Sequence, residues 1–452
     1  MKRPDTSVFR IQDEFGTISL PGLMIPQFFE LLFVQLLGTV NTMMLSHFSE
    51  TAVAAVGVAN QVIGMLVVLL GMIKVGATIF VSISFGASRK ETAYNAAGLG
   101  VFWSFLLGLL AGVVFFSLAT PTMALMKVEG ETLFYASEYF KIRMAFIVLT
   151  LVGNALLSFL RCNGHSVATF VAGVVQNAVN IVLSYLVIFQ PIPFPLKGVS
   201  GIAAAAVVSQ AVGLTIALIA WKKYGFPLIF KQSANLFFKI IRVGAPGATS
   251  SISYSVSQVV STAVIVSLGD SMVAAKIYFA SIFFYVYLFS LSLGQAGAIM
   301  IGRFVGHRDY DKADRLYKQN LKMAVLMNAG LSLMVFFFGK PLLGLFTHNP
   351  EILKLAGSIM LIDILVEVGR GMNHIGENAL NGAGDVLPPM IISMSACWGI
   401  SVLFSYLLGV RLGWGLVGCW IAFMADELFR GCFYLGRWLS GRWKTKEKIT
   451  ES

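Results

Sequence analysis

Long apolar runs separated by short polar connections occupy almost the whole chain. An α-helix needs about 20 predominantly apolar residues to cross a bilayer, and runs of that length recur throughout. The pattern predicts twelve membrane-spanning helices. They lie near residues 21–45, 52–83, 95–117, 138–160, 167–189, 199–220, 240–268, 272–301, 318–338, 354–380, 386–409 and 414–436. The predicted fold class is therefore an all-α integral membrane protein.

The composition supports this class. Of the 452 residues, 57% are hydrophobic and only 12% are charged, whereas a soluble domain carries about 25% charged residues. The connections between the apolar runs are too short to hold a further soluble domain. A soluble enzyme or a nucleic-acid-binding domain is therefore excluded.

The formal net charge is +11, and its distribution along the chain alternates. Lysine and arginine crowd every second connection, within 2–10, 89–90, 222–242, 303–322 and 437–448. Cytoplasmic loops of membrane proteins carry this excess, so both termini are predicted to be cytoplasmic. An even number of spans agrees with that orientation. We therefore interpret the distribution of basic residues as determining the membrane topology, and no nucleic-acid partner is expected.

The two halves of the chain align when one is shifted by 220 residues. The shift pairs Pro26 with Pro246, Gly86 with Gly306, Gly164 with Gly384, and the loop 49–55 with 269–275. Six spans per repeat give both halves the same orientation, so the repeats are parallel and related by a two-fold axis along the membrane normal. This arrangement predicts two six-helix lobes and an alternating-access transporter.

The predicted domain boundaries follow from this repeat. Residues 1–220 form an N-terminal six-helix lobe with a short cytoplasmic leader, and 221–239 form a basic cytoplasmic linker. The linker is expected to be a helix lying on the membrane surface, with its apolar residues in the headgroup zone. Residues 240–438 form the C-terminal lobe, and 439–452 form a basic cytoplasmic tail.

A charged stripe runs through the apolar segment near 354–380. Its members follow one another at spacings of 4, 3, 4 and 3 residues, which places them on one helix face. They are Asp363, Glu367, Arg370, His374 and Glu377. An unpaired charge at the centre of a bilayer costs about 2.5–3.5 kcal/mol or more. The stripe must therefore face protein or water.

Glu367 and Asp363 are the best candidates for binding a coupling cation, because they lie one turn apart and can titrate as a pair. The alternative is a set of neutralising pairs, Glu367 with Arg370 and Asp363 with Arg143. Arg370 is either this internal counter-ion or a site for an anionic group of the substrate. His374 is either a proton relay or a hydrogen-bonded side chain within a polar bundle.

Four further residues are candidate substrate-binding groups. Glu30 follows Pro26, which can bend the first span, and it either attracts a cationic substrate or faces water. Lys74 either lines the cleft, which would suit an anionic or zwitterionic substrate, or snorkels to the surface. Tyr254 and Tyr278 could stack on a flat or cationic substrate, or pack against lipid and neighbouring helices.

Several sequence pieces resemble the multidrug and toxic compound extrusion (MATE) family, over essentially the full length. They are PQFFELLFVQLLGTVNTMMLSHFSETAVAAVG from residue 26, LRCNGHS from 160 followed by NAVNIVLSY, GQAGAIMIGRFVGHRDYDKA from 294, and LNGAGDVLPP from 380. The resemblance implies cation-coupled export of amphipathic compounds from the cytoplasm, driven by Na⁺ or H⁺. The wider superfamily includes flippases of lipid-linked oligosaccharides.

The chain departs from this family at the usual acidic positions. Asn41 and Ser184 stand where many members have a buried aspartate, and Arg370 stands where another branch has an acidic residue. Asn41, Asn180 and Ser184 can still offer neutral oxygen ligands to a cation, but without a carboxylate such a site is weak. The resemblance therefore implies a cation site that has moved to the C-terminal lobe or a transporter that is uncoupled.

The sequence predicts a secondary active exporter of amphipathic small molecules in the plasma membrane, working as a monomer among lipids. The alternative is a flippase or exporter of an anionic lipid-linked or peptide-like metabolite. No cofactor beyond the coupling H⁺ or Na⁺ is expected. An enzyme is not expected either, because the five histidines are scattered and no catalytic motif is present. The four cysteines read as small apolar fillers rather than metal ligands.

Overall fold

The computed structural model describes residues 6–13, 16–190, 197–227, 229, 231, 234–344, 347 and 350–445, and these are mostly helical. Among them, eight helices are long and apolar enough to cross a membrane. The pair α6 (Gly130–Ala145) and α7 (Ile147–Cys162), bent by 52°, could form a ninth span. The protein is therefore a multi-pass membrane protein, while the full set of twelve spans stays a prediction.

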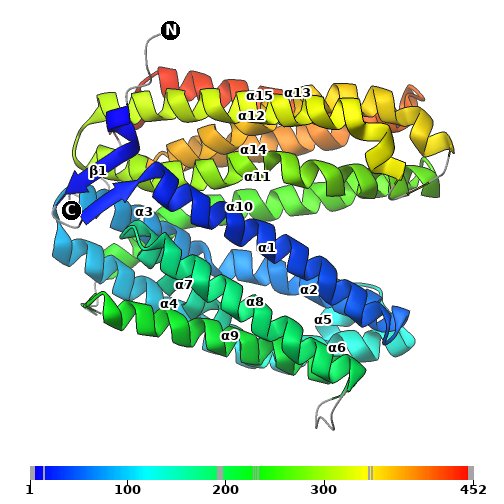
Figure 1. The fold of residues 1–452 in the computed structure, drawn as a ribbon, viewed down its shortest axis with the longest axis horizontal. Coiled ribbons are helices and arrows are strands. Elements are labelled where there is room, and N and C mark those ends of the chain that lie inside the picture. The colour runs from blue at the N-terminus through cyan, green and yellow to red at the C-terminus, as the bar shows by residue number, and fades with distance from the viewer. Residues whose placement is uncertain are drawn as a thin grey trace. The chain divides into compact units, whose positions relative to one another are not determined.

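The first half of the chain begins with a short hairpin and continues as helices (Figure 1). The elements are η1 (Thr6–Phe9, 3₁₀), β1 (Arg10–Asp13), β2 (Gly16–Ser19), α1 (Leu20–Ser46), α2 (Glu50–Leu70), α3 (Met72–Gly86), α4 (Lys90–Ser117), α5 (Ala119–Ala124), α6, α7, α8 (Ser166–Phe189) and α9 (Gly198–Lys223). The predicted run 52–83 is divided at Gly71, the residue between α2 and α3.

The second half consists of helices alone, among the residues that are described. They are α10 (Ala234–Val266), α11 (Asp270–Gly306), α12 (Tyr310–Gly344), α13 (Pro350–Gly382), α14 (Leu387–Ala396), the π-helical segments η2 (Cys397–Val402) and η3 (Ser405–Arg411), and α15 (Gly415–Leu439). The charged stripe predicted near 354–380 therefore lies on a single helix, α13.

The predicted surface helix over 221–239 is wrong. α9 ends at Lys223 and α10 begins at Ala234. The residues described between them are not helical. Gly225 adopts a φ of +67°, which a right-handed helix does not allow, and Pro227 disfavours helical backbone in the residue before it.

The chain divides into two compact units. One contains residues up to Met24, Ser82–Ser88 and the chain from Pro246 onward, and the other contains Ile25–Val81 and Arg89–Ala245. Two of the divisions fall next to Pro26 and at Pro246, which are the prolines related by the 220-residue shift. Each proline lies inside a helix, α1 or α10. A proline removes one backbone hydrogen bond from a helix, so both crossings occur where the helix bends most easily.

Equivalent turns in the two halves have the same backbone geometry. The turn after α7 contains Gly164 and the turn after α13 contains Gly384, each with a φ of +83°. The amide of Gly164 donates to the Arg161 carbonyl at 2.8 Å, and that of Gly384 donates to the Asn381 carbonyl at 2.9 Å. Glycine adopts this left-handed conformation without steric cost. The 220-residue repeat is therefore visible in local structure as well as in sequence.

The N-terminal hairpin belongs to the unit that contains α11. Ile11 pairs with Ile18 across the antiparallel strands, and both side chains are buried. The Asp13 carboxylate forms an ion pair with Arg303 of α11, which is fully buried. The Arg303 guanidinium also lies 5.1 Å from the centroid of the Phe85 ring. The hairpin is thus anchored to α11 by a buried ion pair, with its two isoleucines in the interior.

Replacing Asp13 with alanine should lower the thermal stability of the protein. Removing one partner of a buried ion pair costs about 3–5 kcal/mol, because the other charge keeps its desolvation penalty. We expect Asp13→Ala to melt at a clearly lower temperature than wild type in detergent, as measured by tryptophan fluorescence. Thr17→Ala, exposed on the same hairpin, is the matched control. Equal melting temperatures for all three proteins would show that the ion pair adds no stability.

Candidate functional site

Three members of the predicted stripe form the centre of a buried charge cluster on α13. The side chains of Glu367 and Asp363 are 0% and 2% exposed, and that of Arg370 is 20% exposed. Glu367 and Arg370 form an ion pair three residues apart on the helix. The stripe is therefore buried within its unit, as the cost of placing charge in hydrocarbon requires.

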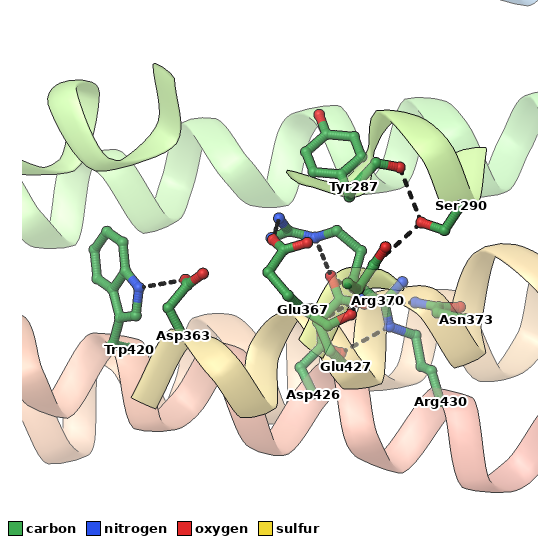
Figure 2. Close-up of polar contacts among 11 residues, drawn as sticks. Tyr287, Ser290, Asp363, Glu367, Arg370, Asn373, Trp420, Asp426, Glu427 and Arg430 are labelled. Carbon is green, nitrogen blue, oxygen red and sulfur yellow. Dashed lines mark hydrogen bonds and ion pairs between the residues drawn. The ribbon is translucent and has the colours of Figure 1, made fainter. Parts of the chain in front are cut away.

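Two carboxylate oxygens of the stripe remain open. Trp420 of α15 donates its indole N–H to Asp363 Oδ1 at 2.9 Å. Asp363 Oδ2 and Glu367 Oε2 are buried and have no hydrogen-bond partner within the part of the chain that the structure describes. Figure 2 shows the Asp363–Trp420 contact one turn away from the ion pair. Buried oxygens of this kind can accept a proton or ligate a cation.

Helix α15 contributes a second group of charges, none of which was among the predicted site residues. Arg430 binds both oxygens of Asp426, at 3.1 and 2.6 Å. Glu427 Oε1 lies 3.2 Å from Arg430 Nη2 and 3.5 Å from Arg370 Nε. Asn373 donates to Glu427 Oε2 at 2.7 Å. Glu427 therefore joins the charges of α13 to those of α15 (Figure 2).

The signal for this second group was present in the sequence. Asp426, Glu427 and Arg430 interrupt the apolar run 414–436 in the same way that the stripe interrupts its neighbour. Counting Asp363, Glu367 and Arg370 together with the three charges of α15, the cluster holds four carboxylates and two guanidiniums. With all six groups ionised, the carboxylates exceed the guanidiniums by two charges. In a low-dielectric interior this excess favours uptake of a cation.

Two tyrosines lie against the guanidiniums. The centroid of the Tyr287 ring is 4.8 Å from the Arg370 guanidinium, and that of Tyr254 is 5.6 Å from the Arg430 guanidinium. The centroid of the His374 imidazole lies 5.6 Å from that of the Tyr287 ring. Tyr278, by contrast, packs against the hydrophobic core of its unit. Of the two predicted aromatic residues, Tyr254 thus lies at the charge cluster and Tyr278 lies against the hydrophobic core.

Helices α13 and α15 approach each other closely beside the cluster. A Cβ atom on Gly369 of α13 would lie 2.9 Å from the backbone carbonyl carbon of Glu427. A Cβ atom on Gly431 of α15 would lie 2.8 Å from Met372 Cβ. Glycine at membrane helix contacts allows backbones to approach in this way. The two glycines therefore hold the Glu427 backbone against α13, within reach of Arg370.

Neighbouring helices support the backbone of the site. Asn328 of α12 donates to the backbone carbonyl of Glu367 at 2.9 Å and to the Ser290 hydroxyl of α11 at 3.2 Å. The Ser290 hydroxyl itself donates to the Tyr287 carbonyl at 2.9 Å, as Figure 2 shows. These bonds link α11, α12 and α13 behind the ion pair and support the backbone at Glu367.

The other unit contains its own ionised group. Arg161 of α7 binds both carboxylate oxygens of Glu30, at 2.7 and 2.9 Å, and donates to Thr169 at 3.2 Å. The charges of Arg161 and Glu30 both act on Lys74 of α3. Glu30 is therefore engaged by a partner that the sequence did not reveal, and the three ionised groups together carry a charge of +1.

The predicted neutral oxygen ligands lie in this same unit. Asn41 of α1 donates its amide to Asn180 Oδ1 of α8 at 2.6 Å. Ser184 lies one turn beyond Asn180 and is buried. Asn41 Oδ1 and Ser184 Oγ have no hydrogen-bond partner among the described residues. Nowhere in the described ranges do three histidine, cysteine, aspartate or glutamate side chains form a group that could hold a metal ion.

Ionised groups buried in membrane helices mark pathways of ions and substrates. The fold and the cluster together therefore define a membrane transport protein. The MatE family model matches residues 26–186 and 246–407, two ranges that begin 220 residues apart. The chain belongs to this family, the MATE transporters, and is not an enzyme.

Curated relatives agree with the family. The chain is 30% identical over 435 residues to "Uncharacterized transporter YisQ" of Bacillus subtilis, covering 95% of this chain and 96% of that one. It is 26% identical over 455 residues to "Probable multidrug resistance protein NorM" of Thermotoga maritima, covering 99% and 96%.

Solved structures share the fold. A MATE transporter in the bent conformation superposes with a TM-score of 0.86 at 21% identity, covering 96% of each chain. A MOP superfamily transporter from Pyrococcus furiosus superposes with a TM-score of 0.85 at 22% identity, covering 94% of this chain and 96% of that one. The second protein is described as having a binding pocket of reverse polarity, which suggests a different function.

Replacing Gly369 with alanine should destabilise the α13–α15 contact. The new methyl group would overlap the backbone at Glu427, and overpacking of this kind costs about 1–3 kcal/mol. We expect Gly369→Ala to melt at a lower temperature than wild type in detergent. Gly357, on the same helix, has open space within 4 Å of the position that a Cβ atom would take, so Gly357→Ala should melt at or above the wild-type temperature. The reverse order would contradict the close approach.

Proposed function

We propose that this protein is a secondary active exporter. It would move amphipathic organic compounds out of the cytoplasm by alternating access, in antiport with H⁺ or Na⁺. The family membership and the relatives named as multidrug resistance proteins support export. The 220-residue repeat supports alternating access, because two equivalent halves can exchange exposure around a central site.

One observation carries the coupling role. Glu367 Oε2 and Asp363 Oδ2 are buried, open to a ligand and one helical turn apart. The excess of carboxylates over guanidiniums around them attracts a cation electrostatically. We therefore assign the coupling cation to Glu367, with Asp363 as its neighbour. Asn41, Asn180 and Ser184 offer only neutral oxygens and are assigned no more than a secondary role.

The remaining parts of the proposal concern the setting. We infer that the protein lies in the plasma membrane with both termini in the cytoplasm, as the distribution of basic residues favours. It would act as a monomer. The substrate would meet the aromatic and charged side chains around Tyr254, His374 and Arg370.

Reconstitution in liposomes tests the coupling role. A proton gradient and a Na⁺ gradient are imposed separately, and uptake of a fluorescent amphipathic cation is followed. We expect gradient-driven uptake by wild type. With Glu367→Gln the uptake rate should fall about tenfold or more, because a neutral amide cannot compensate the charge of a bound cation.

Glu91→Gln is the control for this experiment, since Glu91 is 66% exposed and pairs with the exposed Lys231. It should leave uptake unchanged. If the Glu367→Gln variant keeps gradient-driven uptake, Glu367 is only a structural partner of Arg370.

A second candidate function is export or flipping of an anionic lipid-linked or peptide-like metabolite. The positive group formed by Lys74, Arg161 and Glu30 favours it, because Arg161 already neutralises the carboxylate.

Replacing Lys74 with methionine separates the two candidates. An anionic substrate should lose affinity by about tenfold to a hundredfold, since a hydrogen bond to a charged group is worth about 1.5–3 kcal/mol. The measurement is the half-saturating concentration of a fluorescent anionic amphiphile compared with that of a cationic one. If Lys74→Met leaves the anionic compound unaffected, or if neither wild type nor variant transports it, the anionic candidate fails.

A further inference from the structure

Arg370 lies between two carboxylates that belong to different helices. It forms an ion pair with Glu367 on its own helix, and its Nε lies 3.5 Å from Glu427 Oε1 on α15. A guanidinium has five donors in a rigid fork and can serve two carboxylates at once. Arg370 can therefore pass from one partner to the other without leaving the cluster.

The two carboxylates differ in what else binds them. Glu367 has one open oxygen, Oε2, and is fully buried. Glu427 is held at both oxygens, by Asn373 at Oε2 and by Arg430 at Oε1. Glu427 is thus a fixed acceptor, whereas Glu367 is open to a cation.

We propose that Arg370 is a built-in cation that competes with the coupling ion for Glu367, and that Glu427 receives Arg370 when the ion is bound. This inference rests on the proposed function, because it needs an ion at Glu367. Binding of one monovalent cation to Glu367 neutralises that carboxylate, so Arg370 transfers its contact to Glu427. If the ion is Na⁺, no covalent bond changes; if it is H⁺, an O–H bond forms on the Glu367 carboxylate. In both cases the cluster gains one positive charge.

The exchange gives Glu427 the role of a positioning residue. Glu427 does not bind the ion, but it determines how readily the ion displaces Arg370 from Glu367. The Arg370 guanidinium now lies over the Tyr287 ring and is partly exposed. Its transfer toward α15 changes the charge beside that ring. Binding of the ion at Glu367 therefore changes the charge on the partly exposed face of the cluster.

The test measures the ion concentration that gives half-maximal transport in liposomes containing the full chain. Glu427→Gln removes the second acceptor, so Arg370 holds Glu367 more firmly. We expect this concentration to rise about tenfold or more, a shift within the usual range of coupling between sites. Glu427→Asp keeps the charge and should restore most of the wild-type value.

Asp385→Asn is the matched control. Asp385 is a buried carboxylate of the same unit, and Arg437 of α15 donates to both of its oxygens, at 2.8 and 3.1 Å. Neither residue belongs to the charge cluster, so the half-maximal ion concentration should stay within about twofold of wild type, whatever happens to the maximal rate. A role of Glu427 in structure alone would lower the rate or the melting temperature of Glu427→Gln without moving this concentration, and that result overturns the exchange.

Arg370→Gln provides an independent test if Glu427→Gln does not fold. Removing the competing cation should lower the half-maximal ion concentration, in the direction opposite to Glu427→Gln. An unchanged value in either folded variant overturns the exchange. If Glu367→Gln abolishes coupling while both other variants keep the wild-type value, the proposed function stands and only this inference fails. If Glu367→Gln leaves coupling intact, both fail.

Discussion

Charges placed inside a hydrocarbon layer must be neutralised or given access to water, and this constraint shapes the C-terminal half of the protein. Helices α13 and α15 carry the six charged groups of the cluster, and nearly all of these are buried. Gly369 and Gly431 bring the two backbones together so that the charges meet. Asn328, Asn373 and Ser290 then satisfy neighbouring polar groups. Packing and electrostatics in this region therefore depend on each other.

Helical periodicity was sufficient to predict one half of the site. The 4, 3, 4, 3 spacing placed Glu367 and Arg370 on one face of a helix, and the structure pairs them. The same reasoning applied to the last apolar run would have found Glu427. Periodicity does not predict contacts between distant segments. Arg161 and Glu30, for example, are 131 residues apart in the sequence. Such contacts depend on how the helices pack, and a single helix pattern carries no information about that.

The two halves repeat in backbone but not in chemistry. The turns at Gly164 and Gly384 have the same φ and the same hydrogen-bond pattern. The polar groups on the helices differ. The first half holds one carboxylate, Glu30 paired with Arg161, and the neutral groups of Asn41, Asn180 and Ser184, whereas the second half holds the four carboxylates of the cluster. Turn geometry is fixed by local sterics, whereas side chains on a helix face can change without disturbing the fold. The repeat therefore predicts the frame of the molecule but not the location of its ionised groups.

The anchored hairpin imposes an order on folding during synthesis. Asp13 and its partner Arg303 are 290 residues apart, so the hairpin leaves the ribosome long before α11 does. Until α11 is complete, the hairpin lacks its buried anchor, and the closing contact has a high sequence separation. Docking of the hairpin is thus a late step in biogenesis. A chain interrupted before α11 would therefore lack Arg303, the buried partner that anchors the hairpin.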